Sequence, residues 1–279
     1  MFGKNGRKMP ELPEVHTITE DLKDEIIGYK IYKAAGDKYM RLLLTGNTIT
    51  NVSRLAKNIL IKLSSGPTLR IHLAMTGRIF IKNEEEPQDK WTRLILYLVN
   101  REKKKKLIFS DMRMFGKIEL LQEKDLNKLK NKYGADIFEE EITPQQFLEL
   151  IKSKNSNIKT VLLDQKIVSG LGNIYVTDAL FLSGIHPETK TKHINLKLAG
   201  KLLENIKKVL KEGIKHRGAT LPDKMYVDPL GNPGNYQNFF KIYMREKCPV
   251  CNSKVQNVKI GGRSSFFCPA CQKLSGGLF

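Results

Sequence analysis

The chain has 279 residues, and its 48 Lys and Arg residues outweigh 29 Asp and Glu residues to give a formal net charge of +19 and a pI of about 9.7. This balance favours a polyanion such as nucleic acid as the partner, although a lysine-rich surface that is merely solvated gives the same totals. No apolar run reaches the length of a membrane span, and the first residues contain no apolar signal core. These absences argue against a membrane protein, and we expect a cytoplasmic location.

The first third of the chain predicts one helix followed by strands. Residues 1–8 are polar and basic and are expected to form an unstructured leader. A helix is then predicted from Glu14, with Gly28 as its stop. Its apolar face carries Val15, Ile18, Leu22 and Ile26. Alternating or continuous apolar runs predict strands at 59–63, 69–73, 94–99 and 107–109, with turns at 64–67 and 100–102. This pattern indicates an antiparallel sandwich or barrel, in which Lys103–Lys106 would be a solvated turn.

Helical patterns dominate from about Glu123. Thr143 followed by Pro144 is a strong helix start, because threonine caps exposed N–H groups and proline fits the first helical position. Two glycines, Gly170 and Gly172, precede a further helix, where a plain tight turn and a phosphate-binding turn are both open readings. A long helix ending near Gly213 is predicted to bury a stripe of large apolar residues: Leu196, Leu202, Leu203, Ile206, Val209 and Leu210.

All four cysteines lie near the C-terminus, as Cys248, Cys251, Cys268 and Cys271. They form two C-x-x-C pairs separated by sixteen residues. Two such turns supply the tetrahedron of thiolates that Zn²⁺ prefers, at the spacing of a zinc ribbon. Two disulfides or a redox-active pair are the alternatives. We predict one structural Zn²⁺ ion, since the pairing is complete and the chain has no other thiol.

Several motifs resemble the formamidopyrimidine-DNA glycosylase family, the Fpg branch of the Fpg/Nei glycosylases. They occur in the order of that family over residues 9–273. They are Met9–Val15 (MPELPEV), His72–Gly77 (HLAMTG), Asp111–Gly116 (DMRMFG), the stretch from Leu163 to Pro187, Gly231–Gln237 (GNPGNYQ) and the four-cysteine finger. The sequence departs from the family at Met114, where a second arginine is usual, at Asp178, usually glutamate, and at Trp91–Arg93, usually rich in histidine.

The resemblance implies an α+β fold with three structured parts. Residues 9–122 would form an N-terminal antiparallel β-sandwich catalytic domain, and residues 123–239 a helical helix–two-turn–helix DNA-binding domain. Residues 240–279 would form the zinc finger. The implied partner is damaged double-stranded DNA, and the implied protein is a monomer that is cytoplasmic and associated with the nucleoid through DNA.

The implied activity is that of a bifunctional DNA glycosylase and AP lyase for oxidised purines. The family's nucleophile is the amine of an N-terminal proline, which is Pro10 here, and its general acid is Glu11. An α-amine titrates near pH ~8, whereas lysine titrates near ~10.4, so more of the proline amine is unprotonated at neutral pH. Lys57 matches the lysine that contacts the phosphate beside the lesion. An ordinary loop proline and a surface lysine are the alternatives.

The remaining implied residues contact DNA. Met75, Arg113 and Phe115 match the side chains that fill the gap left by a flipped nucleotide, and plain core packing is the alternative for Met75 and Phe115. Lys159, Asn173 and Arg263 match phosphate contacts, which position DNA without reading its sequence.

Pro10 is preceded by nine residues in this sequence, so its nitrogen is an amide unless the chain is translated from Met9 or the leader is removed. We expect translation from Met9, because methionine before a small residue suits its removal. Two other functions stay open: an endonuclease VIII-like glycosylase for oxidised pyrimidines, and a non-catalytic zinc-dependent DNA-binding protein.

Overall fold

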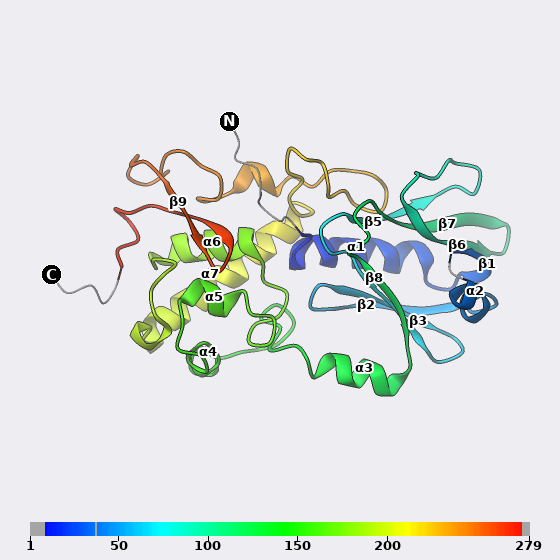
Figure 1. The fold of residues 1–279 in the computed structure, drawn as a ribbon, viewed down its shortest axis with the longest axis horizontal. Coiled ribbons are helices and arrows are strands. Elements are labelled where there is room, and N and C mark those ends of the chain that lie inside the picture. The colour runs from blue at the N-terminus through cyan, green and yellow to red at the C-terminus, as the bar shows by residue number, and fades with distance from the viewer. Residues whose placement is uncertain (1–8, 37, 275–279) are drawn as a thin grey trace. The chain divides into compact units, whose positions relative to one another are not determined.

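The computed structural model describes residues 9–36 and 38–274 (Figure 1). The predicted leader, residues 1–8, lies outside the described residues. The described chain forms two compact units. The N-terminal unit consists of residues 9–131 and 214–237, and the finger unit consists of residues 132–213 and 238–274. Among the described helices, none is both long enough and apolar enough to cross a lipid bilayer.

The N-terminal unit is built on two four-stranded antiparallel sheets. One has the strand order β1-β6-β7-β5 and the other β2-β3-β4-β8. The strands are β1 (Lys30–Ala35), β2 (Ile49–Leu55), β3 (Asn58–Leu63), β4 (Thr68–His72), β5 (Gly77–Lys82), β6 (Thr92–Asn100), β7 (Lys103–Asp111) and β8 (Lys117–Leu121). Its helices are α1 (Leu12–Ile26), α2 (Lys38–Leu44) and α3 (Glu123–Lys130), and Figure 1 labels these elements.

One apolar core joins α1 to both sheets. The predicted helix face is confirmed, because Val15, Ile18, Leu22 and Ile26 are all buried in this core. Strands β3 and β4 pair so that Ile59 lies opposite Ile71, and both side chains are buried in the same core. An alternation of apolar and polar residues on a strand places one face inside, which is why the sequence predicted these strands well.

The prediction of a solvated turn at Lys103–Lys106 is wrong. These residues begin β7, and the turn before them contains only Arg101 and Glu102. Lys106 is buried, and its ammonium group donates to the carbonyls of Glu84, at 2.7 Å, and Glu86. Strand pairing with β6 and these carbonyls therefore outweigh the preference of a lysine for water.

The finger unit is mainly helical, with one hairpin. Its elements are α4 (Pro144–Lys152), α5 (Ile158–Leu162), α6 (Asn173–Ser183), η1 (Thr191–His193), β9 (Gln256–Ile260) and β10 (Arg263–Phe267). Two helices cross the boundaries between the units: α7 (Leu196–Lys215) ends just inside the segment 214–237, and η2 (Tyr236–Phe239) begins just before its end. The predicted cap is confirmed, since the Thr143 hydroxyl accepts from the N–H of Gln146 at 3.2 Å. The helix predicted after Gly172 is also confirmed as α6.

The predicted stripe of α7 is buried except for Leu196, which is 48% exposed because it is the first residue of the helix, at the end of the stripe. The helix also continues two residues beyond Gly213. This glycine has a packing role, because a Cβ at its position would lie 2.4 Å from the Tyr175 ring.

The fold class predicted from the sequence is confirmed: an α+β chain with antiparallel sheets, a helical region and a four-cysteine finger.

Candidate active site and nucleic-acid interface

The predicted nucleophile and general acid lie at the N-terminus of α1. Pro10 and Glu11 are both buried. The backbone N–H of Glu11 donates to Glu14 Oε2 at 2.9 Å, and the other oxygen of Glu14 accepts from the N–H of Ala219 at 2.8 Å. One buried carboxylate therefore holds both the first turn of α1 and the segment 214–237 of the same unit, so the N-terminal end of the helix is fixed on two sides.

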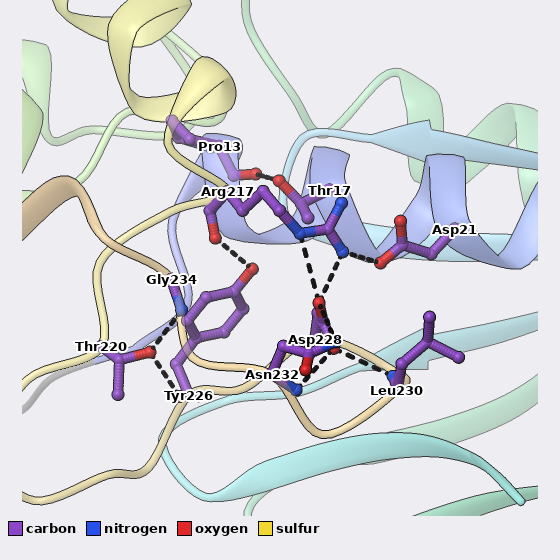
Figure 2. Close-up of polar contacts among 10 residues, drawn as sticks. All are labelled: Pro13, Thr17, Asp21, Arg217, Thr220, Tyr226, Asp228, Leu230, Asn232 and Gly234. Carbon is purple, nitrogen blue, oxygen red and sulfur yellow. Dashed lines mark hydrogen bonds and ion pairs between the residues drawn. The ribbon is translucent and has the colours of Figure 1, made fainter.

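Figure 2 shows how the segment 214–237 is bound to α1. The Arg217 guanidinium lies 2.5 Å from the Asp21 carboxylate of α1 and 2.6 Å from the Asp228 carboxylate. Its hydrogen bond with Asp21, followed by the bond to Asp228, raises the pKa of Arg217, whereas burial raises the pKa of Asp21. The buried Tyr226 hydroxyl donates to the Arg217 carbonyl at 2.8 Å. These contacts hold Arg217, Tyr226 and Asp228 of the segment together and bind them to α1.

The backbone conformation at residues 217 and 218 allows the segment to approach α1 closely. Arg217 has φ +57°, which is uncommon for a residue with a side chain, and Gly218 follows with φ +76°. A Cβ at Gly218 would lie 2.7 Å from Glu14 Cγ, so only glycine allows this close approach. The sequence reasoning missed the network, because its acidic members are far apart in the chain and carry no motif.

Lys57 lies in the two-residue turn between β2 and β3, after Ala56 with φ +52°. The next residue, Asn58, pairs with His72 of β4. Burial, and after it the charges of Arg70 and Lys57, lower the pKa of His72 to about 4. His72 is therefore neutral at physiological pH, and Lys57 is one of the cations near it, together with Arg70 and Lys117.

The two predicted gap-filling loops are joined at their bases. Met75 lies between β4 and β5, while Arg113 and Phe115 lie between β7 and β8. The buried Asp111 carboxylate accepts from the Thr76 hydroxyl of the first loop, and also from the N–H of Gly116 at 2.7 Å. Sequence reasoning missed the role of Asp111, although it opens the motif DMRMFG.

The loop tips are exposed and strained. Phe115 is 56% exposed, so the alternative of core packing is wrong for this residue, while Met75 is half-buried. The Arg113 guanidinium lies 4.9 Å from the centroid of the Phe115 ring. Ala74 and Met114 have φ values of +51° and +57°. Strain of this kind is typical of functional sites, where the surrounding structure holds it in place.

In the finger unit, the structure brings together the three residues predicted to contact phosphate. Lys159 Nζ and Asn173 Nδ2 both donate to the carbonyl of Ser264, at 3.1 and 2.9 Å, and Arg263 is the preceding residue. Arg263 is exposed, whereas Lys159 is fully buried and also contacts the Thr177 hydroxyl at 3.0 Å. Lys159 and Asn173 thus hold the start of the finger hairpin, and Arg263 is the exposed cation.

A buried carboxylate connects α6 to the chain that enters the finger. Asp178 is fully buried and accepts from the N–H groups of Lys241, Ile242 and Tyr243 at 2.9–3.0 Å. Burial raises its pKa, and the three hydrogen bonds oppose that change. The shorter aspartate side chain therefore still reaches three consecutive donors, which orients the finger on α6.

The four cysteines converge on one point with geometry that fits zinc. Their Sγ atoms all lie within 4.8 Å of one another, and three of the pairs are 3.4, 3.5 and 3.8 Å apart. Zn–S bonds of about 2.3 Å in a tetrahedron place the sulfurs about 3.8 Å apart. All four thiols are free, so the alternative of two disulfides is not what the structure contains.

Comparisons with known proteins agree with this geometry. The sequence models that match are the Formamidopyrimidine-DNA glycosylase N-terminal domain at residues 9–118, the H2TH domain of the same family at 133–224, and a zinc finger found in FPG and IleRS at 245–274. A formamidopyrimidine-DNA glycosylase of Pelotomaculum thermopropionicum is 36% identical over 95% of this chain and 100% of its own length. One of Lactobacillus acidophilus is 35% identical over 95% and 99%.

Solved structures show the same likeness. A Lactococcus lactis FPG mutant, crystallised with DNA containing Fapy-dG, has a TM-score of 0.86 and 31% identity, covering 95% of this chain and 100% of that one. The Lactococcus lactis Fpg complex with DNA containing an abasic site has a TM-score of 0.85 and 31% identity, covering 94% and 99%. With three matching domain models and full-length relatives above 30% identity, the chain belongs to the formamidopyrimidine-DNA glycosylase family of DNA glycosylases.

Proposed function

We propose that the protein is a bifunctional DNA glycosylase and AP lyase that removes oxidised purines, 8-oxoguanine and formamidopyrimidines, from double-stranded DNA. The observation that carries this proposal is the placement of Pro10 and Glu11 at the start of α1, where Glu14 and the Arg217 network hold the helix. The match of the N-terminal family model begins at Met9, one residue before the proposed nucleophile. The solved relatives bound to Fapy-dG and abasic-site DNA support the substrate class.

The proposed reaction begins at the amine of Pro10, once Met9 has been removed. Two features favour the unprotonated amine: its burial, and the positive end of the α1 dipole. The nitrogen lone pair forms a bond to C1′ of the damaged nucleotide, the glycosidic bond breaks with its electrons leaving on the base, and the proton lost from the nitrogen passes to the departing base. Glu11 donates a proton to O4′ as the C1′–O4′ bond opens, which gives an iminium ion between Pro10 and the sugar.

The iminium ion accounts for the proposed lyase step. Its positive charge acidifies the C2′ protons, so loss of one proton expels the 3′ phosphate by β-elimination. A second elimination expels the 5′ phosphate, and hydrolysis then frees Pro10. Lys57 would hold the phosphate beside the lesion, and Arg263 would hold the backbone from the finger. Arg113 would hydrogen-bond the cytosine left opposite, because its donors suit the acceptors of that base.

Borohydride trapping tests this function, using protein translated from Met9 and a duplex carrying 8-oxoguanine opposite cytosine. We expect reduction to yield a covalent adduct that maps to Pro10. Trapping only on oxidised pyrimidines would instead support an endonuclease VIII-like enzyme. Tight binding with no adduct on either substrate would support a non-catalytic DNA-binding protein.

A variant separates the acid from the nucleophile. Glu11→Gln should abolish base excision while leaving affinity for damaged duplex within about twofold, because the amide keeps the size of the side chain but carries no ionisable proton. Full excision by this variant would contradict the role of Glu11.

We also propose that the enzyme holds one structural zinc ion and acts on DNA as a monomer associated with the nucleoid. Sedimentation of the protein–duplex complex would test its stoichiometry.

A further inference from the structure

Four large apolar side chains are exposed together at one edge of the N-terminal unit. They are Trp91, Met112, Met114 and Phe115, which are 41%, 45%, 69% and 56% exposed and are called the Trp91 patch below. The described residues contain eleven exposed large hydrophobic side chains, and these four make up over a third of them. Single exposed apolar residues are normal, but a cluster usually marks a binding surface.

Backbone contacts show that Trp91 belongs to the same edge as the loop that follows β7. The Trp91 carbonyl accepts from the N–H of Asp111 at 2.9 Å, although the two residues are twenty positions apart. The Asp89 carboxylate accepts from the N–H of Trp91 at 2.7 Å and from the Ser110 hydroxyl at 2.7 Å. Arg93 then donates to the carbonyl of Gly116 at 2.9 Å. The backbone under the indole ring is therefore fixed while the ring itself faces solvent.

Cations lie on the rings of the patch. The Lys90 ammonium is 5.0 Å from the centroid of the Trp91 ring, and the Arg113 guanidinium is 4.9 Å from that of Phe115. Each of the two rings thus has a positive charge beside it. Such a surface suits a partner whose apolar faces lie close to negative charges. Duplex DNA is such a partner, because its base and sugar faces adjoin phosphates, whereas an apolar protein surface would leave both cations unpaired.

We propose that Trp91 and Met114 act beside Phe115, one of the predicted gap-filling residues, and that they contact the sugar and base faces next to the flipped nucleotide. This proposal rests on the proposed function, since its occupant is the damaged duplex. Met114 has φ +57° and the most exposed side chain of the patch. The patch would make the hold on DNA depend partly on apolar contact, which is less sensitive to salt than contact with phosphate.

Trp91 is the single tryptophan of the chain, so its fluorescence reports on this site alone. The protein is titrated with a duplex carrying a tetrahydrofuran abasic-site analogue, with excitation where tyrosine does not absorb. We expect the tryptophan emission to change as the duplex binds, and to saturate at the concentration at which fluorescence anisotropy of a labelled duplex saturates. Emission that stays constant while anisotropy reports full binding would overturn the proposal.

A matched pair of variants tests the energetic contribution. Trp91→Ser removes the patch side chain, while Leu42→Ser makes a similar change at a residue that is 72% exposed on α2 and outside the patch. We expect Trp91→Ser to weaken duplex binding about tenfold, within the range measured for loss of an aromatic–base contact. Leu42→Ser should bind as the unaltered protein does. Equal affinity of the two variants would contradict the proposal.

Salt dependence separates an apolar contact from a change in charge. The plot of log affinity against log salt concentration for Trp91→Ser should run parallel to that of the unaltered protein, since no phosphate contact is lost. Lys90→Ala should lower the slope by about 0.9 if the ammonium contacts a phosphate. A shallower slope for Trp91→Ser would mean that its effect is electrostatic and would overturn the apolar contact. Failure of the proposed function would show differently, as no borohydride adduct at Pro10 despite a full fluorescence response.

Discussion

The two units present their predicted DNA-contacting residues in opposite ways. In the N-terminal unit, Arg113 and Phe115 project from a loop whose frame is two sheets packed around one large apolar core. In the finger unit, Lys159 is buried and only Arg263 is exposed, and the small apolar cluster at the finger includes two of the four clustered cysteines. The loop of the N-terminal unit thus depends on hydrophobic burial beneath it, whereas the finger hairpin depends on polar contacts and on the cysteine cluster.

The largest expected effect is that of removing the metal, which should unfold the finger but leave the sheets of the N-terminal unit folded. Structural zinc contributes on the order of 10 kcal/mol to the folding of small fingers, and the sheets of the N-terminal unit have no thiols. Chelation, or Cys248→Ser, should therefore unfold the finger and abolish measurable DNA binding, while NMR signals of the sheets persist. Adding zinc back should restore the chelated protein but not the variant. Simultaneous loss of the sheet signals would show that the units are not held independently.

Core truncation should have the next largest effect, and it should act on the N-terminal unit. Phe109 is fully buried in β7, so Phe109→Ala should cost about 3–5 kcal/mol in the free energy of unfolding. Phe115→Ala, six residues later on the exposed loop, should change it by less than about 0.5 kcal/mol yet impair excision. Urea denaturation and a glycosylase assay measure the two quantities. Equal destabilisation by both variants would contradict the view that Phe109 stabilises the sheets and that Phe115 does not.

Acid should weaken the N-terminal unit through His72. Its pKa is lowered from 6.5 to about 4 in the folded state, so its contribution is fully present above pH 6.5 and is lost as the pH falls towards 4. The difference corresponds to about 3 kcal/mol, at 1.36 kcal/mol per pH unit. His72→Gln should flatten this part of the stability–pH curve. An unchanged acid limb, measured by urea denaturation at several pH values, would rule out His72 as its source.

The smallest effect is expected at Arg217. The guanidinium is 44% exposed, so Arg217→Ala should cost less than about 1 kcal/mol. Because Arg217 lowers the pKa of Asp21 against the effect of burial, its loss should raise that pKa further, and Arg217→Lys should raise it less. A ¹³C NMR titration of the Asp21 carboxyl group measures both variants. A fall in this pKa in Arg217→Ala would contradict the network.

The parts of the fold that the sequence predicted are those with a period or a motif. The buried face of α1, the paired strands and the cysteine cluster all follow from regular spacing. The role of Asp111 could not be predicted, because it depends on two loops whose partners, Thr76 and Asp111, are 35 residues apart. Lys103–Lys106 were assigned wrongly because strand pairing outweighed local polarity.

The sequence predicted which residues belong to the candidate site, but it did not predict their burial or their contacts. Motif matches named Lys159 and Arg263 alike, yet only contacts across the fold show that one is a buried support and the other an exposed cation. The exposed Trp91 patch is likewise visible only in three dimensions, since exposure is a property of the folded chain.

The discontinuity of the N-terminal unit has a consequence for the order of events on the ribosome. Glu14 is synthesised 205 residues before Ala219, the donor that fixes its second oxygen. At a translation rate of about 5–20 residues per second, this interval is roughly 10–40 seconds. Once residue 121 has been made the sheets have all their strands, but α1 still lacks this later anchor. Ordering of the first turn of α1 is thereby delayed until helices α3 to α7 have also been made.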